Sequence, residues 1–134
     1  MPNQSVWMIR LSLLYLLVAV TLGSILLIHK AMPLHPATWA LLPIHYEMAI
    51  WGWLVQFVMG TAYWIFPRYL HDKGRGSEGM AWTVVIVLNF GIWLLIMSVF
   101  LESVALAGRT SILISAFLFA GLMWKRVVSY RTHS

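Results

Sequence analysis

Long apolar runs, separated by short polar segments, dominate the pattern of hydrophobic and polar positions along the chain. A helix that crosses the hydrocarbon layer of a bilayer needs about 20 mainly apolar residues. Four runs can serve as such helices, and they cover residues 6–28, 39–66, 80–101 and 111–124. The pattern therefore predicts an all-α integral membrane protein, with a four-transmembrane-helix bundle that forms a single domain over residues 1–134.

Proline and glycine mark the connections between the predicted helices. Three prolines lie in front of or early in the second run, so we expect its helix to begin between Ala37 and Pro43. A polar loop that contains glycine follows this run. Residues 102–110 separate the third run from the fourth, and Gly108 is the predicted turn residue there.

Composition supports the membrane prediction and excludes several kinds of site. The chain has 134 residues, of which 61% are hydrophobic and 10% charged, whereas soluble domains average about 45–50% apolar and 25% charged residues. Cysteine is absent, which excludes disulfides, thiol nucleophiles, thioether-linked haem and cysteine-ligated iron–sulfur clusters. No P-loop, dinucleotide-binding glycine pattern or Ser-His-Asp arrangement is present.

The net charge of +5 indicates membrane topology and not nucleic-acid binding, because the basic residues flank apolar runs. Four spans place both termini on one side, together with the connection between the second and third helices. That side collects Arg10, Arg68, Lys73, Arg75, Lys125, Arg126 and Arg131, and the opposite side has Lys30 and Arg109. The positive-inside rule then predicts cytoplasmic termini, in a bacterial inner membrane, with the first connection facing outward.

Three of the five histidines gather near the predicted outer face. His29 ends the first helix, His35 lies in the first connection, and His45 lies early in the second helix. His71 and His133 lie among basic residues on the predicted cytoplasmic side, and we interpret them as surface residues.

His45 and Glu47 place an imidazole and a carboxylate within the outer part of the bilayer. Ionisable groups are costly there and normally face the bundle interior or a functional site. If Pro43 instead occupies the first helical position, both residues lie in an interfacial first turn, and Glu47 complements the positive end of the helix dipole. The sequence leaves both interpretations open.

One face of the second helix combines His45 with two glycines. Steps of three and four residues join His45, Met48, Gly52, Gln56, Met59, Gly60 and Tyr63. Because Gly52 and Gly60 remove side-chain bulk, we expect either a neighbouring helix or a planar cofactor to pack on this face. On the third run, we interpret Asn89 as an interhelical hydrogen-bonding residue and expect Glu102 to pair with Arg109.

The second run also carries a family resemblance. His45 is followed by Gly52-Trp53, then by Gly60 and Tyr63, and finally by Pro67-Arg68. This segment resembles the second transmembrane helix of the catalytic subunit of the haem–copper oxidase superfamily. The nitric oxide reductase branch and small four-helix proteins described as oxidase subunit I-like are the most similar in pattern. In that family this histidine is an axial ligand of the low-spin haem, so the resemblance implies that His45 binds haem.

The departures from the family pattern limit what the resemblance implies. The chain is too short for a twelve-helix catalytic subunit, and no later helix supplies copper-ligating histidines or a ligand for a second haem. Glu47 and Trp64 stand where many of the small relatives carry histidines. We therefore do not expect reduction of oxygen or nitric oxide by that mechanism, and the sequence favours a protein that is not an enzyme.

Our first hypothesis is a membrane-embedded haem b protein that acts in electron transfer or in redox or gas sensing. His45 is the expected axial ligand, and His29, followed by His35, is the expected second ligand of the iron. Met48, Gly52 and Gly60 share the face of His45, and the expected contacts of the haem propionates are Lys30, Trp39 and Arg109. A redox protein or a quinone is the expected partner, in addition to the lipid bilayer.

The alternative is an oligomeric, channel-like assembly without haem. Its Gly52/Gly60 face would pack against a second copy, and an outer zinc, copper or proton site would use His29, His45 and Glu47, together with His35. Homo-oligomerisation is expected under either hypothesis, because four short helices enclose little interior.

Overall fold

The structure is a computed structural model that describes residues 1–66, 75–124 and 126–127. Within these ranges all regular structure is helical, and His71 and His133 lie outside them. The elements are α1 (Asn3–Ala31), η1 (Pro36–Ala40), α2 (Leu41–Glu47), η2 (Met48–Val55), α3 (Gln56–Ile65), α4 (Glu78–Met97), η3 (Glu102–Val104) and α5 (Ala105–Trp124). Of the segments that the structure describes, four are long and apolar enough to cross a membrane, namely Asn3–Ala31, Pro36–Ile65, Glu78–Met97 and Glu102–Trp124. The prediction of four long apolar helices is confirmed, and they are compatible with an integral membrane protein.

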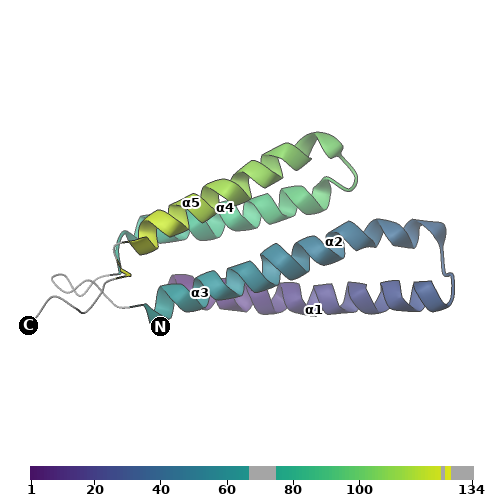
Figure 1. Cartoon of the computed structure of the whole chain (residues 1–134), viewed down its shortest axis with the longest axis horizontal. Helices are drawn as coiled ribbons and strands as arrows, with labels where there is room; N and C mark the ends of the chain where they lie inside the picture. The colour runs from purple at the N-terminus through teal and green to yellow at the C-terminus, as the bar shows by residue number, and fades with distance from the viewer. Residues whose placement is uncertain (67–74, 125, 128–134) are drawn as a thin grey trace, which may run out of the picture.

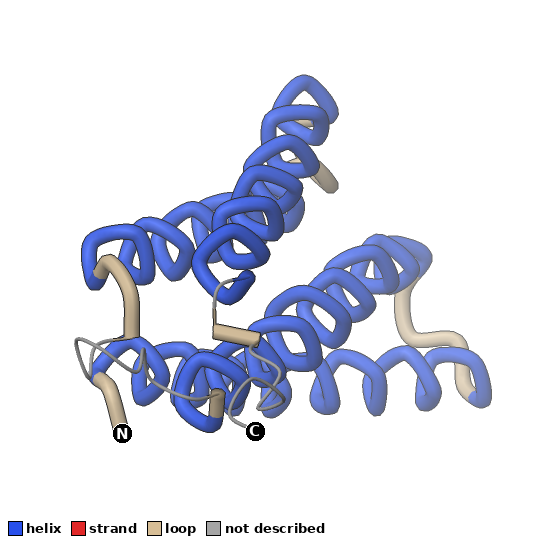
Figure 2. The backbone as a smooth tube through the Cα atoms, turned by 60° about the vertical axis from the view of Figure 1, so that its left-hand side comes forward, coloured by secondary structure: helices blue, strands red, loops and turns tan. Residues whose placement is uncertain are grey.

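Two helical hairpins make up the fold (Figure 1). In the first, α1 packs along α2, η2 and α3, and in the second, α4 packs along α5. Figures 1 and 2 both show the hairpins diverging toward the end that carries η1 and the connection between α4 and α5. The start of α1 and the end of α5 lie at the opposite end, as an even number of spans requires.

The helix boundaries agree with the sequence in the second span and differ in the fourth. The second span enters α-helix at Leu41, inside the predicted interval. The predicted start of the fourth helix at Ser111, with Gly108 as a turn residue, is wrong, because α5 begins at Ala105 and includes Gly108. The polar residues near Arg109 resembled a loop in the sequence, but they belong to the first turns of this helix.

Gly108 is needed for the close approach of α5 to α4. A Cβ atom added at Gly91 would lie 2.9 Å from Ile112 Cγ1 and 3.0 Å from the carbonyl oxygen of Gly108. A Cβ atom added at Gly108 would lie 2.9 Å from Leu95 Cδ2. Small residues at such crossings allow helix backbones to approach each other in membranes, and here they form the tightest part of the second hairpin.

Substituting Gly91 with alanine should therefore destabilise the α4–α5 hairpin. The added methyl group meets backbone as well as side-chain atoms, and overpacking of this kind costs about 1–3 kcal/mol. Gly121→Ala is the matched control, because a Cβ atom there meets nothing within 4 Å. Reversible unfolding in mixed micelles, followed by circular dichroism, measures both free energies of unfolding, and equal values for the two variants would contradict the packing described here.

The middle of the second span departs from α-helical geometry. Met48–Val55 forms a π-helix, and at its end the backbone N–H of Gln56 donates to the carbonyl of Trp51. Gln56 itself is fully buried, and its amide atoms find no partner among the residues that the structure describes. π-Helical turns are often found at functional sites, and a buried amide without a partner is costly. The second span therefore combines a departure from α-helical geometry with a buried amide that has no partner among the described residues.

The core also contains the interhelical hydrogen bond expected of Asn89. The hydroxyl of Tyr15 on α1 donates to Oδ1 of Asn89 on α4 over 3.0 Å. The side-chain amide of Asn89 donates in turn to the carbonyl of Val85. This prediction is confirmed, and the bond joins the two hairpins.

Candidate functional site

His45 lies in the last turn of α2, with its ring against α1. Its Nδ1 atom is 2.8 Å from the carbonyl oxygen of Ala19. A carbonyl oxygen only accepts hydrogen bonds, so Nδ1 must be the donor and must carry the proton. In the neutral imidazole this leaves a free lone pair on Nε2, which is the atom that can bind a metal.

Gly23 makes room for this ring. A Cβ atom added at position 23 would lie 2.8 Å from Cε1 and 3.2 Å from Nδ1 of His45. The ring therefore lies directly over the backbone of α1, one turn beyond the carbonyl that it binds. Together, Ala19 and Gly23 determine both the orientation and the protonation pattern of His45.

His29 and His35 have the opposite protonation pattern. The backbone N–H of Leu34 donates to Nδ1 of His29 over 2.9 Å, and the backbone N–H of Ala37 donates to Nδ1 of His35 over 3.1 Å. An Nδ1 atom that accepts has no proton, so each neutral ring carries its proton on Nε2. While these bonds persist, neither Nε2 atom has a lone pair to offer to iron. Both histidines instead stabilise the connection between α1 and the second span.

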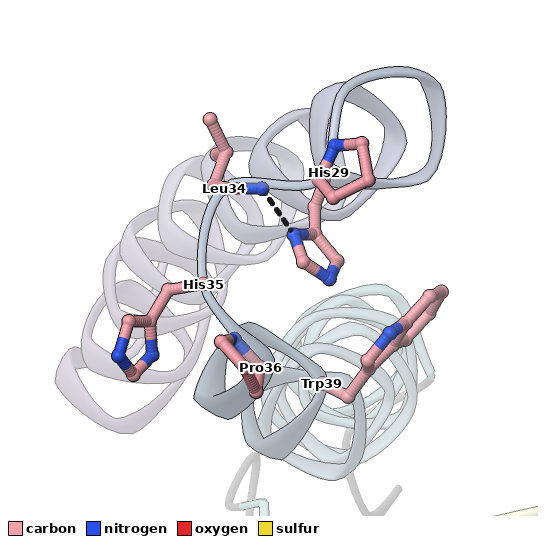
Figure 3. Close-up of a pocket in the computed structure, with 6 residues that line it drawn as sticks. His29, Leu34, His35, Pro36 and Trp39 are labelled. Carbon is pink, nitrogen blue, oxygen red and sulfur yellow. Dashed lines mark hydrogen bonds between the residues drawn. The ribbon is translucent and has the colours of Figure 1, made fainter.

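A pocket of about 460 Å³ lies beside this connection (Figure 3). Its lining consists of His29, Pro33, Leu34, His35, Pro36 and Trp39. The ring of His29 extends toward Trp39, whereas the ring of His35 points away from both (Figure 3). The His29 and Trp39 rings meet edge to face, with centroids 5.3 Å apart. His29 is only 6% exposed, so it is a buried imidazole at the wall of an open pocket.

Glu47 is buried and forms an ion pair that joins the two hairpins. Its carboxylate accepts two hydrogen bonds from Arg109, at 2.5 and 3.2 Å. Its side chain is 6% exposed, and that of Arg109 is 54% exposed. Glu47 thus faces the bundle interior, in agreement with the first of the two interpretations drawn from the sequence. The predicted pairing of Glu102 with Arg109 is wrong, because the guanidinium reaches across to α2.

Helix α1 occupies the face that carries the two glycines of the second span. A Cβ atom at Gly52 would lie 2.5 Å from Cγ of Tyr15, and one at Gly60 would lie 2.9 Å from Cβ of Met8. Met48, on the same face, is buried in the core. The sequence analysis expected either a neighbouring helix or a planar cofactor on this face, and in the structure a neighbouring helix packs there.

No family model, curated protein or solved structure matches the chain. The resemblance of the second span to the oxidase helix therefore stays a prediction, and the case for a site depends on the side chains themselves. Among the residues that the structure describes, no three histidine, aspartate or glutamate side chains gather as a metal site.

Arg126 has a role that the sequence did not indicate. We expected it among the basic residues that flank the apolar runs on the cytoplasmic side, but it is 1% exposed. Its guanidinium donates to the carbonyl oxygens of Tyr63 and Phe66 at 2.9 and 2.6 Å, and lies 5.0 Å from the centre of the Tyr63 ring. Basic side chains often bind the last carbonyls of their own helix, whereas Arg126 caps α3, a different helix. Nothing in the local sequence indicates such a partner.

Proposed function

We propose that this protein is a membrane-embedded b-type haem protein in which Nε2 of His45 is an axial ligand of the iron. The observation that carries the proposal is the hydrogen bond from Nδ1 of His45 to the carbonyl of Ala19. A metal-binding histidine usually donates its second ring N–H to such an acceptor, which orients the ring and increases the basicity of the ligating nitrogen. His29 and His35 lack this arrangement.

Three further features support haem at this position. Haem b needs no cysteine attachment, and the chain has no cysteine. The π-helix begins three residues after His45, and such turns are often functional. The oxidase-like pattern of the second span has its axial histidine at this position. In the proposed site Gly23 seats the ring, whereas Gly52 and Gly60 serve helix packing.

The remaining histidines suggest how the iron is coordinated. Because His29 and His35 accept at Nδ1, neither is a ready second ligand, so the described residues would offer the iron one ligand and leave a second position open. A haem with an open position supplies one-electron exchange and binding of a diatomic ligand. Arg109 is engaged by Glu47, so exposed Lys30 is the better of the two cations to receive a propionate.

The channel-like alternative has less support. It requires His45 and Glu47 in an outer metal or proton site, but Glu47 is paired with Arg109 and His45 with a backbone carbonyl. A zinc or copper site needs three or four ligands, so a second copy of the chain would have to complete it. Cytoplasmic termini, a bacterial inner membrane and homo-oligomerisation remain parts of our proposal.

Absorption spectroscopy of the detergent-purified protein tests the haem proposal. Oxidised and dithionite-reduced spectra, together with a pyridine haemochrome assay, should identify haem b. We expect a broad high-spin reduced spectrum that sharpens when carbon monoxide is added, because one axial position is open. Sharp reduced α and β bands without a carbon monoxide response would contradict the open position, and the absence of haem after expression with added haem precursor would contradict the whole proposal.

A further inference from the structure

The pocket beside the first connection has one buried polar group, the imidazole of His29. Because Nδ1 accepts from the N–H of Leu34, the neutral ring holds its proton on Nε2 and can only donate there. Among the residues that the structure describes, none forms a hydrogen bond with Nε2. The pocket therefore presents one buried hydrogen-bond donor, which the backbone N–H of Leu34 holds in position.

The remaining lining is mainly apolar and aromatic, and the exposed His35 is its other polar residue. Pro33, Leu34 and Pro36 supply aliphatic surface, and Trp39 supplies an indole ring. The volume of about 460 Å³ falls within the range of about 300–1,000 Å³ that is typical of small-molecule sites. Such a site suits a flat apolar ring that carries a hydrogen-bond acceptor.

The charge of the pocket lining distinguishes between two kinds of hydrogen-bond acceptor in a bilayer, phosphate groups and neutral carbonyl oxygens. The pocket lining contains no lysine or arginine, and a phosphate group would need such a partner to offset the cost of its burial. A neutral carbonyl oxygen needs only the one N–H that His29 offers. We propose that this pocket binds the headgroup of a quinone, with one ring carbonyl accepting from Nε2 of His29 and the ring packed against Trp39.

The position of the pocket is compatible with a membrane-dissolved ligand. It lies at the end of the bundle where α1 passes into the second span, so an isoprenoid tail can remain in the bilayer while the headgroup enters. Trp39 and His45 are six residues apart, which is about 9 Å along a helix. Electron exchange between such a quinone and a haem bound to His45 rests on the proposed function. Binding of the quinone ring in the pocket does not.

A pair of ligands tests the hydrogen bond without altering the protein. Isothermal titration calorimetry would compare tetramethylbenzoquinone with tetramethylbenzene, which has the same ring and methyl groups but no carbonyl. We expect the quinone to bind about tenfold more tightly, the effect of one net hydrogen bond. The titrations use the full chain and are repeated on His45→Ala. Quinone binding by a haem-free His45→Ala protein would leave this inference intact even if the haem proposal failed, and equal affinity for both ligands would overturn it.

Two matched histidine variants test the assigned residue. His29→Asn keeps an acceptor for the N–H of Leu34, but its shorter side chain has no donor at the position of Nε2, so quinone affinity should fall about tenfold. His35→Asn keeps the cap of η1, since asparagine is a favoured N-cap residue, and should lower affinity less than His29→Asn does, because the His35 ring, although it belongs to the lining, points away from His29 and Trp39 (Figure 3). Trp39→Leu should weaken both ligands alike and provides a second variant if His29→Asn does not fold.

A lipid occupant has a distinct signature. If the pocket were built for a phospholipid headgroup, short-chain phosphatidylglycerol would displace the quinone, and His29→Asn would not change the quinone affinity. Either result would overturn the inference. Failure of phosphatidylglycerol to compete, together with the loss in His29→Asn, would support it.

Discussion

Haem should be lost from the protein when His45 is replaced by alanine, while the four helices remain inserted in the membrane. Removing a group that only orients a metal ligand already costs about 10–100-fold in metal affinity, so removing the ligand itself should lower haem retention by more than this. The half-buried ring contributes little to the core, which is why we expect the fold to survive. Haem content per chain, from pyridine haemochrome and protein assays on the purified variant, measures the effect.

His29 and His35 provide the controls for this experiment. His29→Asn and His35→Asn preserve acceptors for the backbone N–H groups of Leu34 and Ala37, and both should retain haem at the wild-type ratio. Circular dichroism would establish that the helix content of all three variants is unchanged. Wild-type haem content in a folded His45→Ala protein would exclude His45 as the ligand.

The second large effect should come from Arg109→Gln, which leaves the buried carboxylate of Glu47 without its cation. Breaking a buried ion pair from one side costs about 3–5 kcal/mol. We expect about 3 kcal/mol in the free energy of unfolding here, the low end of that range, because the Arg109 side chain is 54% exposed. Reversible unfolding in mixed micelles would measure it.

A double-mutant cycle separates the ion pair from other effects of the substitution. Glu47→Gln combined with Arg109→Gln removes both charges, so the double variant should be more stable than Arg109→Gln alone. Lys30→Gln is the matched control, since Lys30 is an exposed cation at the same end of the bundle. Additive effects of the two substitutions would indicate that the pair does not join the hairpins energetically.

The apolar pattern was sufficient to predict four helices, because length and hydropathy alone identify a span. It was not sufficient to locate the start of α5. Arg109 and the hydroxyl residues after it resembled a loop, yet the charge of Arg109 is matched by Glu47, 62 positions earlier. No local pattern records so distant a partner. The π-helix was missed for a different reason, since a continuous apolar run from Met48 to Val55 suits either kind of helix.

The candidate site was only partly accessible to sequence reasoning. His45 could be selected because an ionisable group inside a span requires a reason. The tautomer of His45 could not be predicted, because it depends on the carbonyl oxygen of Ala19, a backbone atom of another helix. The sequence placed His29 and His45 near the same predicted membrane face. It could not reveal that Nδ1 accepts a hydrogen bond in His29 and donates one in His45.

The contact between Gly23 and the imidazole of His45 also has an evolutionary consequence. With a histidine at position 45, any side chain at position 23 would have to displace the ring, because even a Cβ atom would lie 2.8 Å from Cε1. The two sites should therefore covary, so that glycine persists at position 23 in homologues that keep the histidine and drifts to larger residues in those that have lost it. Divergence at position 23 would then mark the lineages in which this imidazole had ceased to serve as a ligand.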